Sequence, residues 1–202
     1  MLAATLPSPT IAEEVLLRKR FTRDEVQQMM ALGLFEGKRY ELIDGDLIGK
    51  MGQNPPHANG VRRLHRALVA VFGIGRVQAQ LPIEAGPQDS EWNMPEPDLA
   101  VLQAQDDNAF EKRHPRGDEL VLAAEVSDTT VRHDSTSKRD LYARAGVPEY
   151  WVLDINSGLL RIHRYLRDGV YEEIADHDET AVIRASGAPG IDIPVVDLLL
   201  KK

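Results

Sequence analysis

The chain has 202 residues, of which 43% are hydrophobic and 28% are charged, values that are ordinary for a globular protein with room for a real core. Its formal net charge of −8 argues against a protein that coats nucleic acid through bulk charge, although an enzyme acting on nucleic acid is not excluded. The absence of cysteine excludes disulfides and thiolate metal sites, so any metal must be held by oxygen or imidazole ligands.

No run of eighteen apolar residues is present, so no membrane span is expected. The first ten residues lack a cationic start followed by an apolar segment, and we therefore expect no secretory signal. With the missing cysteines, this favours a cytoplasmic protein. Residues 1–20 are predicted to form a flexible leader, and residues 21–202 are predicted to form one domain.

The N-terminal third of this domain has three predicted elements. A capping box at Thr22 indicates a helix that ends at Gly33. Two strand-like runs flank the turn signal Asp44-Gly45, so residues 40–50 are predicted to form a β-hairpin. A second helix is expected from about 57 to 72, because its apolar residues recur at helical spacing.

The rest of the chain mixes strands with one crossover helix. The run 120–126 is almost entirely apolar, as expected of a central strand buried on both faces. A helix capped by Asp134 or Ser135 should follow and end at Gly146. Further strands are predicted at 76–84, 97–102, 149–155, 159–166 and 170–174, with a short apolar tail at 195–200. This order predicts an α/β or α+β domain with a mixed sheet flanked by helices.

Two carboxylates interrupt apolar strands. Glu125 lies inside the run 120–126, where burying a carboxylate is costly unless it is paired or bound to a cation. Asp98 begins the strand 97–102, where it shares a face with Ala100 and Leu102 because side chains alternate along a strand. Glu125 shares a face with Ala123 and Ser127 for the same reason. If the two strands are neighbours, both groups converge near one end of the sheet. Because like charges repel, a divalent cation is then the natural neutralising group.

Lys138 is the third candidate. It lies three and four residues before Leu141 and Tyr142, so it shares the core-facing stripe of the predicted helix. A lysine on that side needs a partner, and Glu125 or a substrate phosphate would supply one. Two carboxylates that hold Mg²⁺, together with a lysine that orients water or offsets phosphate charge, suit phosphodiester cleavage.

The motifs that surround these residues resemble the Uma2 family of the PD-(D/E)XK restriction-endonuclease-like superfamily. The resemblance covers about residues 21–200, and it rests on the segment YELIDGDL (40–47), His57 at a helix start, Pro97-Asp98, Glu125-Val126-Ser127, Asp134, Lys138, Tyr142 and GVPEYW (146–151). It implies a restriction-endonuclease-like mixed sheet with an N-terminal β-hairpin and a site at one sheet edge. One departure from the superfamily pattern is Ser127, which stands where the motif has lysine.

The resemblance also implies residue roles. Asp98 and Glu125 would ligate Mg²⁺ or Mn²⁺, Lys138 would replace the motif lysine, and Glu41 would be a further acidic residue near the site. Ser127 is expected to support the Glu125 turn. His57 is expected to make local hydrogen bonds at its helix start, more so than to act as a catalytic base. Basic residues that could contact nucleic acid are Arg62, Arg63, Arg66 and Arg139.

Three of the candidates also have a structural interpretation. Asp98 could belong to a turn after Pro97, Lys138 could pair with Glu125 without catalysing anything, and Glu41 could lie on the surface of its hairpin.

Three functions are consistent with a buried carboxylate pair. The first is a Mg²⁺-dependent endonuclease acting on DNA, for which a homodimer is expected because two sites are commonly needed to cut a duplex. The second is an inactive nuclease-like fold that serves as a binding or assembly module. The third, a glycoside hydrolase with a carboxylate pair, is disfavoured because only 5% of the residues are aromatic.

Overall fold

The computed structural model describes residues 19–50, 54–104 and 109–200. The predicted leader lies outside the described residues except for its last two positions. The helices and strands in chain order are α1 (Arg23–Ala31), β1 (Arg39–Ile43), β2 (Asp46–Lys50), α2 (Pro55–Phe72), β3 (Val77–Ala79), β4 (Leu99–Leu102), β5 (Leu120–Ser127), α3 (Val131–His133), a π-helical turn (Asp134–Lys138), α4 (Arg139–Arg144), β6 (Tyr150–Asp154), β7 (Leu159–Arg167), β8 (Val170–His177), β9 (Val182–Ile183) and β10 (Ile193–Pro194).

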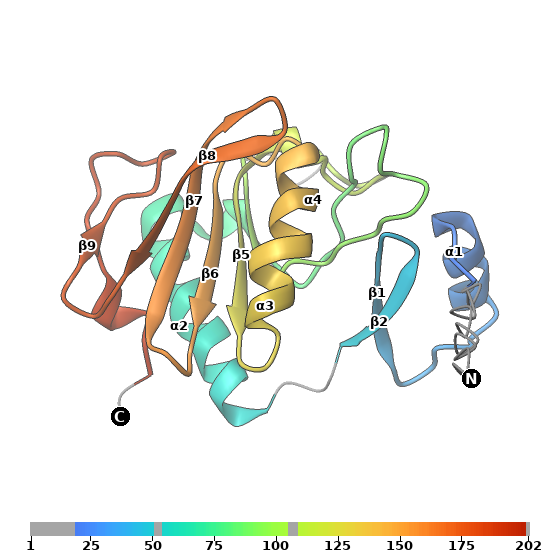
Figure 1. Cartoon of the computed structure of the whole chain (residues 1–202), viewed down its shortest axis with the longest axis horizontal. Coiled ribbons are helices and arrows are strands. Elements are labelled where there is room, and N and C mark those ends of the chain that lie inside the picture. The colour runs from blue at the N-terminus through green and yellow to red at the C-terminus, as the bar shows by residue number, and fades with distance from the viewer. Residues whose placement is uncertain (1–18, 51–53, 105–108, 201–202) are drawn as a thin grey trace, which may run out of the picture.

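A six-stranded mixed sheet forms the centre of the molecule, in the order β3-β4-β5-β6-β7-β8. β5 and β6 run parallel, whereas the other neighbours are antiparallel. A parallel pair needs a long crossover, and α3, the π-helical turn and α4 supply it. Figure 1 shows this crossover on one face of the sheet and α2 on the other. The predicted fold class, a mixed sheet flanked by helices, is therefore confirmed.

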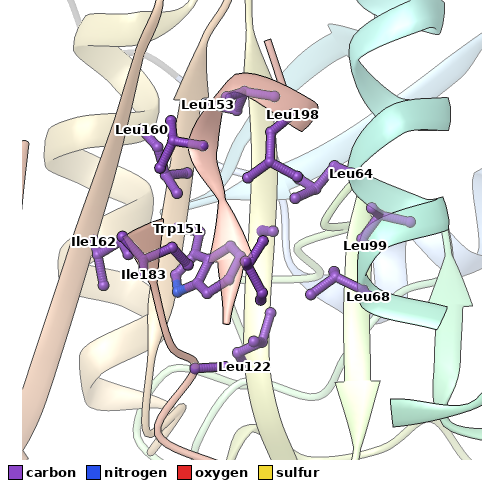
Figure 2. Close-up of a cluster of buried hydrophobic side chains, with 14 of the residues drawn as sticks. Leu64, Leu68, Leu99, Leu122, Trp151, Leu153, Leu160, Ile162, Ile183 and Leu198 are labelled. Atoms are coloured by element: carbon purple, nitrogen blue, oxygen red, sulfur yellow. The ribbon is translucent and has the colours of Figure 1, made fainter. Parts of the chain in front are cut away.

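Two apolar layers hold the helices to the sheet. On one face, Leu64 and Leu68 of α2 pack with Trp151 of β6 and with the C-terminal segment, as Figure 2 shows. On the other face, Tyr142 of α4 packs with Ala123, Tyr150 and their neighbours. Alternation along β4 and β5 divides their residues between the two layers, because successive side chains of a strand point to opposite faces. The face under α4 is the one that carries Asp98 and Glu125.

The N-terminal hairpin forms its own two-stranded sheet beside the main one (Figure 1). Its turn residues Asp44 and Gly45 both have positive φ angles of 49° and 82°, as a two-residue hairpin turn requires. α1 begins with the predicted capping box at Thr22, and Phe21 packs near Val26. The predicted hairpin and first helix are thus both present.

Some predicted boundaries are wrong. The strand expected at 76–84 is only β3, because Gln80 has a φ of 52° that ends the extended backbone. α2 begins at Pro55 after an Asn54 cap, since proline is well suited to the first turn of a helix. Asp134 and Ser135 do not cap the crossover helix. The helical backbone already begins at Val131.

In the part of the chain that is described, no helix is both long enough and apolar enough to cross a bilayer.

Candidate active site

Asp98 and Glu125 meet at one end of the sheet. β4 pairs antiparallel with β5, with Leu99 opposite Ala124, and continuing this register by one residue sets Asp98 opposite Glu125. The backbone N–H of Asp98 donates to Glu125 Oε2 at 3.4 Å, and the N–H of Val126 donates to Asp98 Oδ2 at 2.9 Å. Both carboxylates are buried, with exposures of 4% and 3%. The structure therefore brings together two acids that are 27 residues apart in the chain.

Lys138 is the last residue of the π-helical turn, and its side chain points at these acids. Its ammonium lies 2.9 Å from Glu125 Oε1 and 3.0 Å from Glu41 Oε1, and its side chain is 3% exposed. Tyr142, one helical turn later, donates its hydroxyl to the same Glu125 oxygen at 2.9 Å. Lys138 and Tyr142 thus share one acceptor, and Glu41 of β1 closes the group from the hairpin side.

The π-helical turn places Lys138 at the end of an irregular segment. A π turn contains one residue more than an α turn, so the side chains after it are rotated relative to those before it. The Asp134 carbonyl in this turn accepts a hydrogen bond from the Tyr150 hydroxyl at 3.0 Å. The Ser127 hydroxyl donates to Asp134 Oδ2 at 2.5 Å, and Asp134 Oδ1 lies 3.8 Å from the Lys138 ammonium. Ser127 therefore acts on the lysine through Asp134.

His57 contacts the other side of Asp98. Its backbone N–H donates to the Asn54 cap at 2.9 Å, which is the local hydrogen bond expected at a helix start. Its ring Nε2 also lies 3.2 Å from Asp98 Oδ2, a contact that joins the first turn of α2 to the site. This hydrogen bond to Asp98 raises the pKa of His57, despite an opposing effect of burial.

A cavity of about 170 Å³ opens onto the carboxylate pair. Its walls come from the hairpin, the sheet end, the first turn of α2 and the segment from β5 to the π-helical turn. The lining includes Arg39, Glu41, Ile48, Lys50, Asn54, His57, Asp98, Glu125, Asp134 and Lys138. Because one water occupies roughly 10–15 Å³ on this measure, the space suffices for a hydrated ion and a phosphate group.

The buried charges of the site do not balance. The carboxylates of Glu41, Asp98, Glu125 and Asp134 face the Lys138 ammonium, which is 3% exposed, and the Lys50 ammonium, which is 16% exposed, lines the same cavity. Burial raises the pKa of Glu125, since Lys138 offsets the effect only in part. Burial alone would lower the pKa of Lys138, but the surrounding carboxylates, that of Glu125 foremost, raise it. Lys138 thus stays charged, and a divalent cation at Asp98 and Glu125 would relieve the repulsion between these two carboxylates.

The sequence-predicted residues fall into two groups. Glu41, His57, Asp98, Glu125 and Lys138 all line the cavity, and the Ser127 hydroxyl reaches it through Asp134. The four arginines predicted to contact nucleic acid do not line it. Arg62 and Arg66 are exposed on α2, Arg63 and Arg139 are partly exposed, and Arg139 pairs with its neighbour Asp140.

Sequence reasoning missed several contributors to the site, among them Asp134, which was expected only as a helix cap and contacts the Lys138 ammonium. Arg39 and Lys50, which are paired at the open end of the hairpin, line the cavity and have no role in the sequence-based prediction. Their position at strand ends beside Glu41 was the available signal, because residues two apart on a strand share a face. The hydroxyl of Tyr142 was also missed, since the residue was assigned only to the core.

Comparisons with known proteins identify the fold and the family of the chain. No curated protein matches the sequence. A crystal structure from Anabaena variabilis ATCC 29413, described as "a putative nuclease belonging to DUF820", superposes with a TM-score of 0.63 at 15% identity, over 79% of this chain and 88% of that one. At this identity the likeness establishes the fold alone. The sequence model of the Uma2 family, described as "Putative restriction endonuclease", matches residues 24–196. The chain therefore belongs to the Uma2 family.

Proposed function

We propose that the protein is a metal-dependent endonuclease that hydrolyses phosphodiester bonds of nucleic acid, with DNA as the favoured substrate. The observation that carries the proposal is the convergence of Asp98, Glu125 and Lys138 on one cavity. Membership of a family described as "Putative restriction endonuclease" supports the reaction class. Hydrolysis of a phosphodiester needs an activated water and positive charge near the phosphate, and this residue set suits both needs.

The donor chemistry fits Mg²⁺ or Mn²⁺. Asp98 and Glu125 offer hard carboxylate oxygens, and among the described residues Asp98 Oδ1 has no hydrogen-bond donor. No cluster of three or more acidic or imidazole groups suited to a metal occurs within 19–50, 54–104 and 109–200. Mg²⁺ is commonly held by one or two carboxylates with several waters retained, so two acids are sufficient. A bound ion would polarise the phosphate and acidify a water molecule.

The remaining residues have distinct roles in this proposal. Lys138 would orient the attacking water or offset the charge that develops on the phosphate. Glu41 and Asp134 would hold the ammonium in place, since both contact it. His57 would orient the Asp98 carboxylate through the 3.2 Å contact. Tyr142 would fix the Glu125 oxygen that it shares with the lysine.

The test is cleavage of supercoiled plasmid by the full chain with Mg²⁺, with Mn²⁺ or with EDTA. We expect nicked or linear product only with metal. Asp98→Asn, Glu125→Gln and Lys138→Met should each lower the rate by about 100-fold or more. Glu173→Gln, on the exposed side of β8, is the matched control and should cleave like the parent. Cleavage that persists in EDTA or in both carboxylate variants would contradict the proposal.

The second candidate is a nuclease-like module that binds without cutting. The observation in its favour is that Lys138 is already engaged by three carboxylates and Ser127 replaces the motif lysine. Nucleic-acid binding without metal-dependent cleavage would support this candidate. A homodimer is proposed only for the cutting enzyme, and a sedimentation measurement of the full chain would test it.

A further inference from the structure

Two cations on the hairpin remain without a role in the reaction proposed above. Arg39 and Lys50 are direct partners across β1 and β2, and both line the cavity. Residues paired in this way point to the same face, so the two positive side chains stand side by side. Like charges directly opposite each other destabilise a strand pair. Their juxtaposition at the cavity wall therefore calls for an anion between or beside them.

The Glu96 carboxylate neutralises part of this positive charge from outside the cavity. Its carboxylate oxygen Oε1 pairs with Arg39 and lies 3.4 Å from the Lys50 ammonium. Glu96 itself is not among the residues that line the cavity. One carboxylate thus fixes two cations, and the group of three retains a net charge of +1 toward the cavity.

Gln80 holds the arginine from the other side. Its side-chain oxygen accepts a hydrogen bond from Arg39 at 2.9 Å, and its backbone N–H donates to the Asp98 carbonyl at 3.1 Å. Gln80 adopts a φ of 52°, a conformation that costs energy for a residue other than glycine and that occurs often at functional sites. The strained residue thus ties the arginine to the chain segment that carries Asp98.

We propose that Arg39 and Lys50 form a phosphate-binding fork, which holds a backbone phosphate of the nucleic acid next to the one that is cut. This inference rests on the proposed function, because it assigns the substrate contact of the same cavity. Arginine binds phosphate oxygens in a bidentate manner and lysine acts as a point charge, so the pair suits a phosphodiester. Within the cavity the fork is the principal nucleic-acid contact, because the arginines of α2 do not line it.

The position of Lys50 strengthens the assignment. Its side chain is only 16% exposed and that of Arg39 is 47% exposed, so the fork extends from the cavity wall to the solvent. A nucleic-acid backbone entering from solvent would therefore meet Arg39 first, then Lys50, and then the carboxylates of the site. Such contacts fix the register of a nucleic acid and carry no information about its sequence.

The test measures binding separately from cleavage. Anisotropy of a fluorescent 20-base-pair DNA is followed with the full chain in EDTA, over a series of NaCl concentrations. Arg39→Gln and Lys50→Gln should each weaken binding by about fivefold or more and reduce the salt slope by about 0.7–0.9, the loss of one phosphate contact. Arg167→Gln, an exposed arginine of β7, is the matched control and should bind like the parent.

The outcomes separate the fork from the reaction. Unchanged affinity in both fork variants overturns the fork, as does a loss confined to Arg62→Gln or Arg66→Gln, or a parent chain that binds no DNA. If metal-dependent cleavage is retained although the fork variants bind normally, or although only the α2 variants lose affinity, the fork is rejected and the proposed nuclease stands. Binding that depends on the fork without any cleavage keeps the fork and removes the nuclease. Because Lys50 is largely buried, circular dichroism checks folding, and the more exposed Arg39→Gln carries the test if Lys50→Gln unfolds.

Discussion

The Lys138 ammonium lies 2.9 Å from Glu125 Oε1. Lys138 ends the π-helical turn and Glu125 lies inside the central strand β5. The contact ties the crossover helix to the sheet at the point where the cavity opens. It also explains how a lysine outside the usual motif position reaches the acids. The site therefore depends on the docking of the crossover helix as much as on β4 and β5.

Removing this ammonium should destabilise the fold. Lys138→Met leaves Glu41, Glu125 and Asp134 buried without their cation, and breaking a buried ion pair in this way costs about 3–5 kcal/mol of unfolding free energy. Urea unfolding at pH 7 measures the change. Lys19→Met, which removes an exposed pair with Glu25, should leave the unfolding midpoint nearly unchanged. A loss as small as that of the control would contradict the burial of the lysine.

Metal binding should stabilise the folded chain through the carboxylate pair. An ion at one hundred times its dissociation constant adds about 2.7 kcal/mol, or about 5–10 °C in Tm for a chain of this length. We expect Mg²⁺ or Mn²⁺ to raise Tm, EDTA to reverse the rise, and Asp98→Asn to abolish it. Asp178→Asn, on an exposed turn, is the control. An equal rise in Asp98→Asn would place the ion elsewhere.

Much of this architecture was predictable from local patterns. The turn signal Asp44-Gly45 located the hairpin, and the helical periodicity of 57–72 located α2 apart from its first turn. The apolar run around Glu125 identified the central strand. The inward direction of Lys138 also followed from its spacing, because the stripe shared with Tyr142 survives the irregular turn.

The remaining features depend on contacts between distant segments. The π-helical turn could not be predicted, because its Asp134 carbonyl is satisfied by Tyr150 from the next strand. The end of β3 at Gln80 depends on a backbone conformation that local composition does not specify. The ion pairs that orient Arg39 and Lys50 were not predictable for the same reason. Glu96, which orients both cations, follows the hairpin by more than forty residues.

Gly60 should be required where α2 crosses β5. A Cβ atom at this position would stand 2.7 Å from Val126 Cγ1 and 3.2 Å from Ile155 Cγ2, and valine has little freedom to move away. Alanine gains about 1 kcal/mol in helix propensity, but overpacking costs about 1–3 kcal/mol, so Gly60→Ala should destabilise the protein on balance. Ala70→Gly, at an exposed position of the same helix, calibrates the propensity effect. A more stable Gly60→Ala would show that α2 shifts freely.

His163 should make the protein sensitive to acid. Its ring is fully buried, its Nδ1 lies 3.1 Å from the Tyr150 carbonyl, and it stacks on the Tyr150 ring. Burial lowers the pKa of His163 to about 4 from an ordinary value near 6.5. Between pH 4 and pH 6.5 the His163 imidazole is therefore protonated in the unfolded chain and neutral in the folded chain. The resulting stabilisation is complete above pH 6.5 and is lost as the pH falls toward 4.

The size of this acid effect is on the order of 3 kcal/mol, which follows from about 1.4 kcal/mol for each pKa unit. His163→Phe keeps a ring in the stack but removes the titrating group, so its unfolding free energy should vary less between pH 6.5 and 4 than that of the parent. Urea unfolding across this range measures the slope. Tyr171→Phe removes the hydrogen bond to the Val147 carbonyl in the same cluster, and it should lower stability while retaining the slope of the parent. Identical slopes for His163→Phe and the parent would show that the buried imidazole does not control acid stability.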